Sequence, residues 1–168
     1  DRFAWQMAWM AKRGYRTVNL DEYHDMITGV RPADRKAFLI TFDDGYLDNL
    51  TEAAPILERH GFTAVVYPVA NQIGRDNRCW PMADPKGLGD FMDVGQLRAW
   101  LDAGHEVGSH TLSHPPLTTV DDTQLTDELV QSRSRLEALV GKPCTSLAYP
   151  VGDADSRVAT AARDAGYD

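Results

Sequence analysis

Two adjacent carboxylates, Asp43 and Asp44, stand where an apolar segment of the chain ends. The apolar run through Phe42 predicts a buried strand, and Gly45 predicts a turn directly after it. The doublet would therefore lie at the carboxyl end of a strand, where α/β enzymes place their reactive groups. Asp-Asp-Gly alone is also a common turn sequence. Adjacency does not decide which aspartate would bind a metal ion and which would move a proton.

The histidines His110 and His114 are the second group that could do chemistry. Because Pro115 and Pro116 follow at once, their spacing predicts one helical turn with both imidazoles on the same side. One carboxylate with two imidazoles predicts a divalent-metal site with open positions, and the second carboxylate would handle a proton. Two histidines alone could equally be solvated. Both groups follow apolar strands at matching ends, so we favour the metal site of a hydrolase.

The segments around these groups alternate between extended and helical patterns, which predicts an α/β fold with a mainly parallel sheet. The predicted strands are residues 17–20, 37–42, 64–69, 106–108 and 146–148. The predicted helices include residues 3–11, 55–60, 121–140 and 156–164, and one opened by a capping box of Asp93 and Gln96. Reactive segments follow three strands, as in a (β/α) barrel, which needs about eight strands. We therefore expect a barrel that is incomplete at the C-terminus.

The composition narrows the classes of partner. At 168 residues the chain fits one domain with an ordinary core. Its net charge of -8 argues against nucleic-acid partners, and no apolar stretch is long enough to span a membrane. The chain begins with Asp1 rather than methionine, so we expect a processed or trimmed product. Cys79 and Cys144 are too few for a disulfide scaffold, and we expect two unpaired thiols rather than one bridge.

Several other residues have structural explanations that we prefer. His105, at the start of a predicted strand, is expected to make structural hydrogen bonds rather than to bind the metal. Trp5, Trp9 and Trp100 fall on helical stripes and are expected in the core. Trp80 lies in the longest irregular segment, and loops of that length often border a functional groove. Surface packing is our expectation for Trp80, with sugar stacking as the alternative.

Two segments resemble a known family. Residues 41–46 (Thr-Phe-Asp-Asp-Gly-Tyr) and 110–114 (His-Thr-Leu-Ser-His) resemble the first two motifs of the polysaccharide deacetylases, carbohydrate esterase family 4 or NodB-homology domain. Residues 61–67, 104–110 and 147–152 also fit the family pattern, so the resemblance covers nearly the whole chain. It implies a distorted (β/α) barrel and metal-dependent hydrolysis of acetyl groups, usually N-acetyl groups on amino sugars.

The resemblance also implies roles for the reactive residues. By position, Asp43 matches the catalytic base of the family. Asp44, His110 and His114 match its metal-binding triad. Zinc is the divalent ion that the resemblance implies first, and cobalt or nickel serves some members. An N-acetylated glycan is the implied substrate, and the implied location is outside the cytoplasm, secreted or in the cell envelope.

The third motif is matched by Tyr149, Pro150 and Val151, which would line the substrate groove. There a backbone N–H, that of Val151, would join the metal in stabilising the oxyanion. Many members carry an arginine before this segment to orient the base, whereas this chain has Ala148. The Ala-Tyr-Pro-x-Gly form resembles the branch that acts on exopolysaccharides such as poly-N-acetylglucosamine.

No residue of this chain matches the later motifs of the family, including the histidine that protonates the leaving amine. Those motifs would lie beyond Asp168, so residues 1–168 are expected to be a truncated form of a single catalytic domain. Three alternatives to a glycan deacetylase stay open at this point. They are a small-ring amidohydrolase of the same fold, a catalytically inactive glycan- or metal-binding module, and a non-haem iron oxygenase, which also uses two histidines and a carboxylate.

Overall fold

The computed structural model describes residues 2–79 and 89–168, so Trp80 lies outside the described residues. The helices are α1 (Arg2–Lys12), α2 (Leu20–Ile27), α3 (Ala54–Glu58), α4 (Val94–Asp102), α5 (Asp122–Val140) and α6 (Ser156–Asp164). The strands are β1 (Arg16–Thr17), β2 (Ala37–Phe38), β3 (Thr41–Asp44), β4 (Val65–Pro68) and β5 (Glu106–Val107). Short helical turns are η1 (Asn49–Ala53), η2 (Asn77–Cys79), η3 (Leu117–Thr119) and η4 (Pro150–Gly152).

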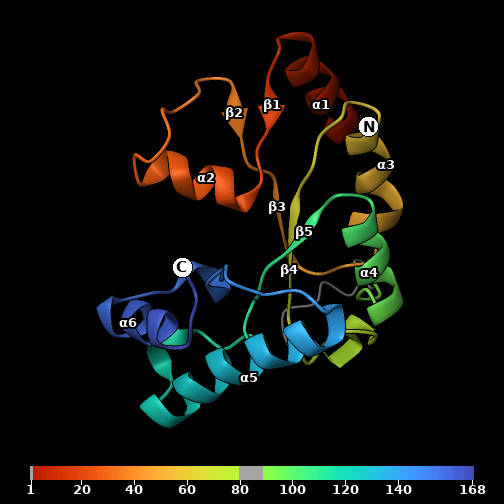
Figure 1. The fold of residues 1–168 in the computed structure, drawn as a ribbon. Helices are drawn as coiled ribbons and strands as arrows, with labels where there is room; N and C mark the ends of the chain where they lie inside the picture. The colour runs from red at the N-terminus through yellow and green to blue at the C-terminus, as the bar shows by residue number, and fades with distance from the viewer. Residues whose placement is uncertain (1, 80–88) are drawn as a thin grey trace.

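The strands form two separate parallel sheets. β1 pairs with β2, and β3, β4 and β5 are neighbours in that order. A parallel bridge between Ser109 and Leu147 continues the larger sheet beyond β5. Helices α1, α3 and α4 lie along one side of this sheet, α5 runs across its lower end, and α2 lies apart with β1 and β2 (Figure 1). The α/β class is confirmed, whereas the described strands do not close into a barrel, so the predicted barrel is not confirmed.

The predicted strand at residues 37–42 is wrong as a single element. Its first two residues form β2 in the small sheet, and β3 begins at Thr41 in the large one. Between them, the carbonyl oxygen of Ile40 already accepts a hydrogen bond from the N–H of Val65 at 2.9 Å. An apolar run indicates burial but does not identify the neighbouring strand, so the change of partner could not be read from it.

The predicted strand at residues 17–20 is also wrong beyond Thr17. The side chain of Asn19 accepts a hydrogen bond from the N–H of Glu22 at 2.7 Å and thereby caps α2. Asparagine is among the preferred residues at this position because its side chain satisfies an amide that has no partner within the helix. Local capping therefore begins a helix where the β-branched residues before it predicted a strand.

The starts of α4 and α5, each with a side-chain cap, lie where the sequence predicts them. Asp93 accepts from the N–H of Gln96 at 2.8 Å, and Gln96 accepts from the N–H of Asp93 at 2.7 Å, which is a complete capping box. Asp121 accepts from the N–H of Gln124 at 2.9 Å and opens α5. Gly141, with φ of 73°, ends that helix in the left-handed conformation that glycine adopts without strain.

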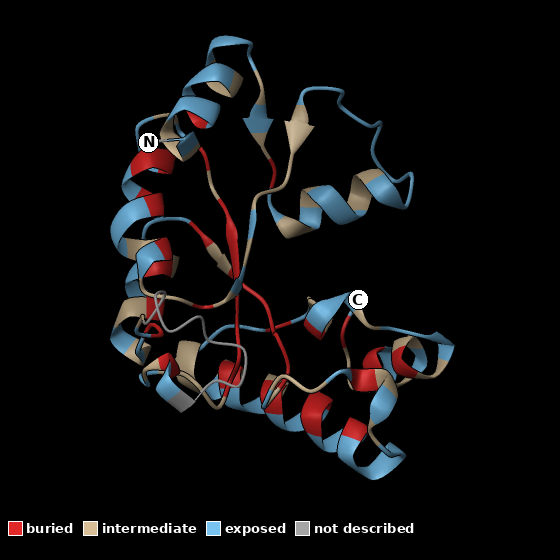
Figure 2. Cartoon of the chain, turned by 180° about the vertical axis from the view of Figure 1, so that it is seen from behind, coloured by how far each residue is buried: buried red, intermediate tan, exposed pale blue. Residues whose placement is uncertain are grey.

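The core has two hydrophobic clusters, and buried residues run through the large sheet and the helices packed on it (Figure 2). The first packs Leu57, Val66 and Trp100 between the sheet and α1, α3 and α4. The second packs the buried face of α5, including Leu125 and Leu129, against α6 and η3. The strand that carries the acidic doublet packs against the first cluster, and the loop that carries the two histidines packs against the second.

The prediction that three tryptophans lie in the core is right for Trp100 and wrong for Trp5 and Trp9. Trp100 is fully buried, whereas the exposed fractions of Trp5 and Trp9 are 65% and 37%. Met7 is the residue that α1 buries. A helical stripe of large apolar residues does not identify which face of the helix the rest of the protein covers.

His105 and Cys144 have the structural roles expected of them. The Nδ1 atom of His105 accepts a hydrogen bond from the N–H of Ala64 at 3.2 Å, and its ring stacks on Trp100. Cys144 is a free, buried thiol, and burial raises its pKa to about 12, so it is unreactive. The side chain of Cys79 lies outside the described part of the chain. Within that part, no helix has the length and apolar character needed to cross a bilayer.

Candidate metal centre

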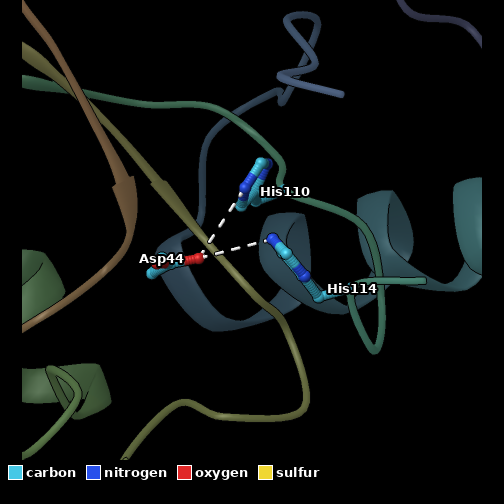
Figure 3. A group of neighbouring side chains, drawn as sticks. All are labelled: Asp44, His110 and His114. Carbon is cyan, nitrogen blue, oxygen red and sulfur yellow. Dashed lines mark ion pairs between the residues drawn. The ribbon is translucent and has the colours of Figure 1, made fainter. Parts of the chain in front are cut away.

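Asp44, His110 and His114 meet at the carboxyl end of the large sheet (Figure 3). The Oδ1 atom of Asp44 lies 3.7 Å from Nε2 of His110 and 3.6 Å from Nε2 of His114. Asp44 is the last residue of β3, and both histidines belong to the loop after β5. The structure thus brings together one oxygen and two nitrogen donors from segments that are far apart in the sequence.

Gly45 makes the position of Asp44 sterically possible. Its φ is 82°, and a Cβ atom at this residue would lie 2.7 Å from Cβ and 2.9 Å from Cα of Pro68. Only glycine fits such a close approach to the neighbouring strand. The chain therefore leaves the sheet immediately after Asp44, and the carboxylate stays at the strand end instead of continuing along it.

The prediction that His110 and His114 share a helical turn is wrong. Residues 110–116 form an irregular loop, in which Thr111 and His114 have φ values of 68° and 67°. The Oγ1 atom of Thr111 accepts a hydrogen bond from the N–H of His114 at 3.0 Å. Two left-handed residues reverse the chain tightly, and they bring the imidazoles together with ring centroids 4.7 Å apart. A four-residue spacing fits this turn as well as a helix.

His110 is oriented by the backbone of a third segment. Its Nδ1 atom lies 2.8 Å from the carbonyl oxygen of Ala148, which can only accept, so Nδ1 carries the proton and Nε2 has the free lone pair. Ser109 donates its N–H to Ser146 and accepts from the N–H of Ala148, each at 2.9 Å. Metal-binding histidines typically have such an outer partner. This partner could not be predicted from residue types, because it is a backbone carbonyl.

The ionisation of His114 also favours metal binding. Burial lowers the pKa of His114, the neighbouring imidazole of His110 lowers it further, and the carboxylate of Asp44 opposes both effects. A lowered pKa keeps the ring neutral at physiological pH, and the neutral imidazole is the form that binds a metal ion.

The three donors fit a zinc-like ion. The Oδ1 atom of Asp44 is buried and has no hydrogen-bond partner, which is costly for a carboxylate unless a cation satisfies it. Donors placed tetrahedrally about 2.0–2.1 Å from zinc lie about 3.3 Å from one another, and both measured distances from Oδ1 are only a few tenths of an ångström longer. Three protein donors leave a position for water or substrate, as in catalytic rather than structural zinc sites.

The other residues singled out in the sequence lie close along the chain to Asp44 or to Ala148, which supports His110. Asp43 is exposed and does not belong to the group of three ligands. Tyr149 is half-buried, Pro150 is buried and Val151 is exposed, and the last two lie in η4. Residues 149–151, the predicted groove residues, directly follow Ala148 in the sequence, and the carbonyl of Ala148 supports His110.

Backbone strain is concentrated in these segments. Within the described residues, the non-glycine residues with positive φ are Asp44, Thr111, His114 and Val151. Each such residue costs on the order of 1–3 kcal/mol, and strain of this kind collects at functional sites. All four belong to the acidic doublet, the histidine loop or the segment 149–151. The destabilising backbone conformations therefore lie where the sequence predicts function.

Fold and donor set together define a class of protein, and the family model for polysaccharide deacetylases matches residues 30–168. The chain therefore belongs to the polysaccharide deacetylase family. This membership agrees with the resemblance that residues 41–46 and 110–114 show in the sequence.

Two curated relatives match very different shares of the chain. YxkH of Bacillus subtilis (strain 168), whose name places it among polysaccharide deacetylases, is 28% identical over 165 residues, 98% of this chain and 54% of that protein. The poly-β-1,6-N-acetyl-D-glucosamine N-deacetylase of Escherichia coli (strain K12) is 35% identical over 68 residues, 40% of this chain and 10% of that protein. The chain thus spans about half the length of the first relative and a tenth of the second.

Solved structures show the same fold. The Streptococcus pyogenes deacetylase PplD, solved in complex with acetate, has a TM-score of 0.84 at 21% identity, covering 98% of this chain and 68% of that chain. IcaB from Ammonifex degensii has a TM-score of 0.83 at 23% identity, covering 99% of this chain and 72% of that chain. The described sheets and helices are therefore arranged as in these proteins.

Proposed function

We propose that the protein is a metal-dependent hydrolase that removes N-acetyl groups from a polysaccharide. The observation that carries the proposal is the buried, unpartnered Oδ1 of Asp44 facing the Nε2 atoms of His110 and His114. These residues would hold one divalent ion, with zinc as the first choice and cobalt or nickel as substitutes. When bound, the ion would supply Lewis-acid activation of water and of the acetyl oxygen.

Asp43 is the proposed general base. It precedes Asp44 on β3 and is exposed, so its carboxylate can reach a water molecule from solvent, whereas Asp44 is committed to the histidines. General-base catalysis requires a carboxylate within hydrogen-bond reach of the proton that it removes. In this proposal Asp44 binds the metal ion and Asp43 accepts the proton, a division of roles that their adjacency in the sequence did not decide.

The third segment is proposed to bind the oxyanion that develops on the acetyl carbonyl. In η4, the N–H groups of Gly152 and Asp153 donate back to Tyr149 and Pro150. The N–H of Val151, which has φ of 53°, is the remaining amide of this turn. A backbone donor fixed in a strained turn is a suitable stabiliser of developing negative charge.

A poly-N-acetylglucosamine-type glycan is the proposed substrate, because one relative is named for deacetylating poly-β-1,6-N-acetyl-D-glucosamine. Such a substrate would place the protein outside the cytoplasm. We also propose that residues 1–168 are part of one catalytic domain with a distorted (β/α) barrel. The alignments support this view, because they cover nearly all of this chain but only 54% of YxkH and 68% of PplD. The general acid would then come from a further segment.

Acetate release from N-acetylated glucosamine oligomers tests the proposal. The zinc-loaded protein should release acetate, and a chelator should stop the release. Asp43→Asn should keep its zinc and lose about 10²–10⁴-fold in rate, the usual contribution of a general base. His114→Ala should lose zinc on dialysis, measured by elemental analysis.

Three results would contradict the proposal. Near-normal acetate release by Asp43→Asn would remove that residue from the mechanism. Cleavage of small cyclic amides without acetate release would instead favour an amidohydrolase. A protein that binds zinc and attacks neither substrate would be a binding module.

A further inference from the structure

A buried carboxylate beneath the histidine loop has no role in the proposed reaction. Glu128, in the middle of α5, is 5% exposed. Its Oε2 atom accepts hydrogen bonds from the N–H groups of Leu112 at 2.9 Å and Ser113 at 2.8 Å. Its Oε1 atom accepts a hydrogen bond from the hydroxyl of Ser113. Buried glutamates are rare unless their charge is compensated, and these three donors all come from the segment between the two histidines.

The hydrogen bonds to Glu128 hold a backbone that is strained on both sides. Thr111, just before the two donating amides, and His114, just after them, both have positive φ. Successive N–H groups next to a left-handed residue form a concave site for an anion, and here a side-chain carboxylate occupies it. Three hydrogen bonds to one buried side chain can offset part of the cost of this strain.

A second contact from α5 fixes the start of the same loop. Ser132, one turn after Glu128, is within 3.2 Å of the hydroxyl of Ser109, and that hydroxyl accepts from the N–H of Thr111 at 3.2 Å. His110 has its own support from the carbonyl of Ala148. The N–H of His114 donates to Oγ1 of Thr111 at 3.0 Å, so His114 is joined to the same backbone turn. Glu128 therefore helps to set the position of His114 relative to Asp44.

We infer that Glu128 is a positioning residue for the metal centre: it sets the backbone of residues 111–114 so that Nε2 of His114 faces Oδ1 of Asp44. This inference rests on the proposed function, because it assumes that the cluster binds a metal ion. The role is geometric. An uncharged side chain of the same shape should fulfil it, and a charged side chain that is too short should not.

Zinc affinity of Glu128 variants, measured by competition with a chromophoric chelator, tests the inference. Glu128→Gln keeps an acceptor for both amides and can donate to the Ser113 hydroxyl, so its affinity should stay within a few-fold of wild type. Glu128→Asp keeps the charge but is one methylene shorter, and Glu128→Ala removes the acceptor. Both should bind zinc about 10- to 100-fold more weakly, the usual effect of losing an outer-shell partner. The visible spectrum of the cobalt-substituted protein should change in these two variants.

Glu137→Ala is the matched control. Glu137 is on the same helix and also accepts a backbone N–H, that of Cys144 at 3.0 Å, away from the histidines. Its loss should lower the melting temperature without changing zinc affinity or the cobalt spectrum. Wild-type zinc affinity in folded Glu128→Asp or Glu128→Ala would overturn the positioning role and leave the metal centre standing. A wild-type protein that binds no zinc would overturn the proposed function and this inference together.

Discussion

The large sheet with α5 and the small sheet with α2 are held by different forces. All four residues of β4 are buried, and α5 buries five residues, among them Leu129. Between residues 16 and 38, all of which the structure describes, Val18 is the buried residue, and α2 buries none. The proposed site lies in the first region. Side chains that must keep sub-ångström positions are thus carried by the part of the molecule that hydrophobic burial makes rigid.

The region around α2 is held by polar contacts. Glu22 accepts from Arg16 at 2.8 Å and 3.0 Å and from Arg31 at 2.8 Å, and Arg16 also donates to Asp34. The Leu20 N–H donates to Glu106 at 2.9 Å and so joins α2 to the large sheet. Exposed ion pairs contribute little stability because water and salt screen them. We therefore expect this region to open at a lower free energy than the region that carries the site.

The largest difference in the free energy of unfolding is expected between two truncations to alanine, one in each region. Leu129→Ala should lower the free energy of unfolding by about 2–5 kcal/mol, because Leu129 is fully buried beneath the histidine loop. Ile27→Ala on α2, where the side chain is 62% exposed, should change it by less than about 0.5 kcal/mol. Chemical denaturation of both variants measures the contrast. Equal losses would mean that the two regions do not differ in the way proposed.

A smaller effect, and one that depends on pH, is expected from His105 in the buried region. Burial lowers the pKa of His105 in the folded protein below its ordinary value of about 6.5. The unfolded chain then binds more protons, so this contribution to stability is complete above about pH 6.5 and is lost as the pH falls. His105→Asn keeps an acceptor for the Ala64 N–H but cannot titrate.

The melting temperature measured from pH 8 to pH 5 checks this prediction. The variant should lose less stability than wild type on the acid side, and the two curves should have the same slope near pH 8. An unchanged slope below pH 6.5 would show that His105 does not contribute to the acid sensitivity of the fold.

The smallest effect is expected on α2. The hydrogen bond from Arg16 lowers the pKa of the Glu22 carboxyl, and the smaller effect of desolvation opposes it. Glu22→Gln should therefore shift the melting temperature only slightly at low salt and not measurably at high salt, where exposed charges are screened. A large, salt-independent loss would show that the ion pairs, rather than burial, hold this region. Measurements at two ionic strengths distinguish these outcomes.

Local signals in the sequence predicted much of the fold. The caps at Asp93 and Asp121 lie where the sequence places them, because a cap depends on residues three positions apart. The change of partner within residues 37–42 and the exposure of Trp5 were missed, because both depend on which distant element covers a segment. Local chemistry is encoded locally, whereas sheet partners and covered faces are properties of the whole chain.

The candidate site was predictable in composition but not in conformation. Asp44, His110 and His114 could be singled out because their residue types and spacing suit a metal ion, and the structure brings them together. The left-handed backbone at Thr111 carries no sequence signal, since threonine rarely adopts it. The support by Glu128 was missed for a similar reason, because a glutamate on an amphipathic helix looks like any solvated side chain.

The left-handed residues of the site limit how this protein could be made more heat-resistant. Glycine at Thr111 or His114 would ease the backbone, and engineering for thermostability commonly exploits such relief. Here the exchange would delete a proposed ligand or the hydroxyl that anchors it. Gains in heat resistance must therefore come from elsewhere, and the thinly packed surroundings of α2 offer the most room for added apolar contacts that leave the proposed metal centre unchanged.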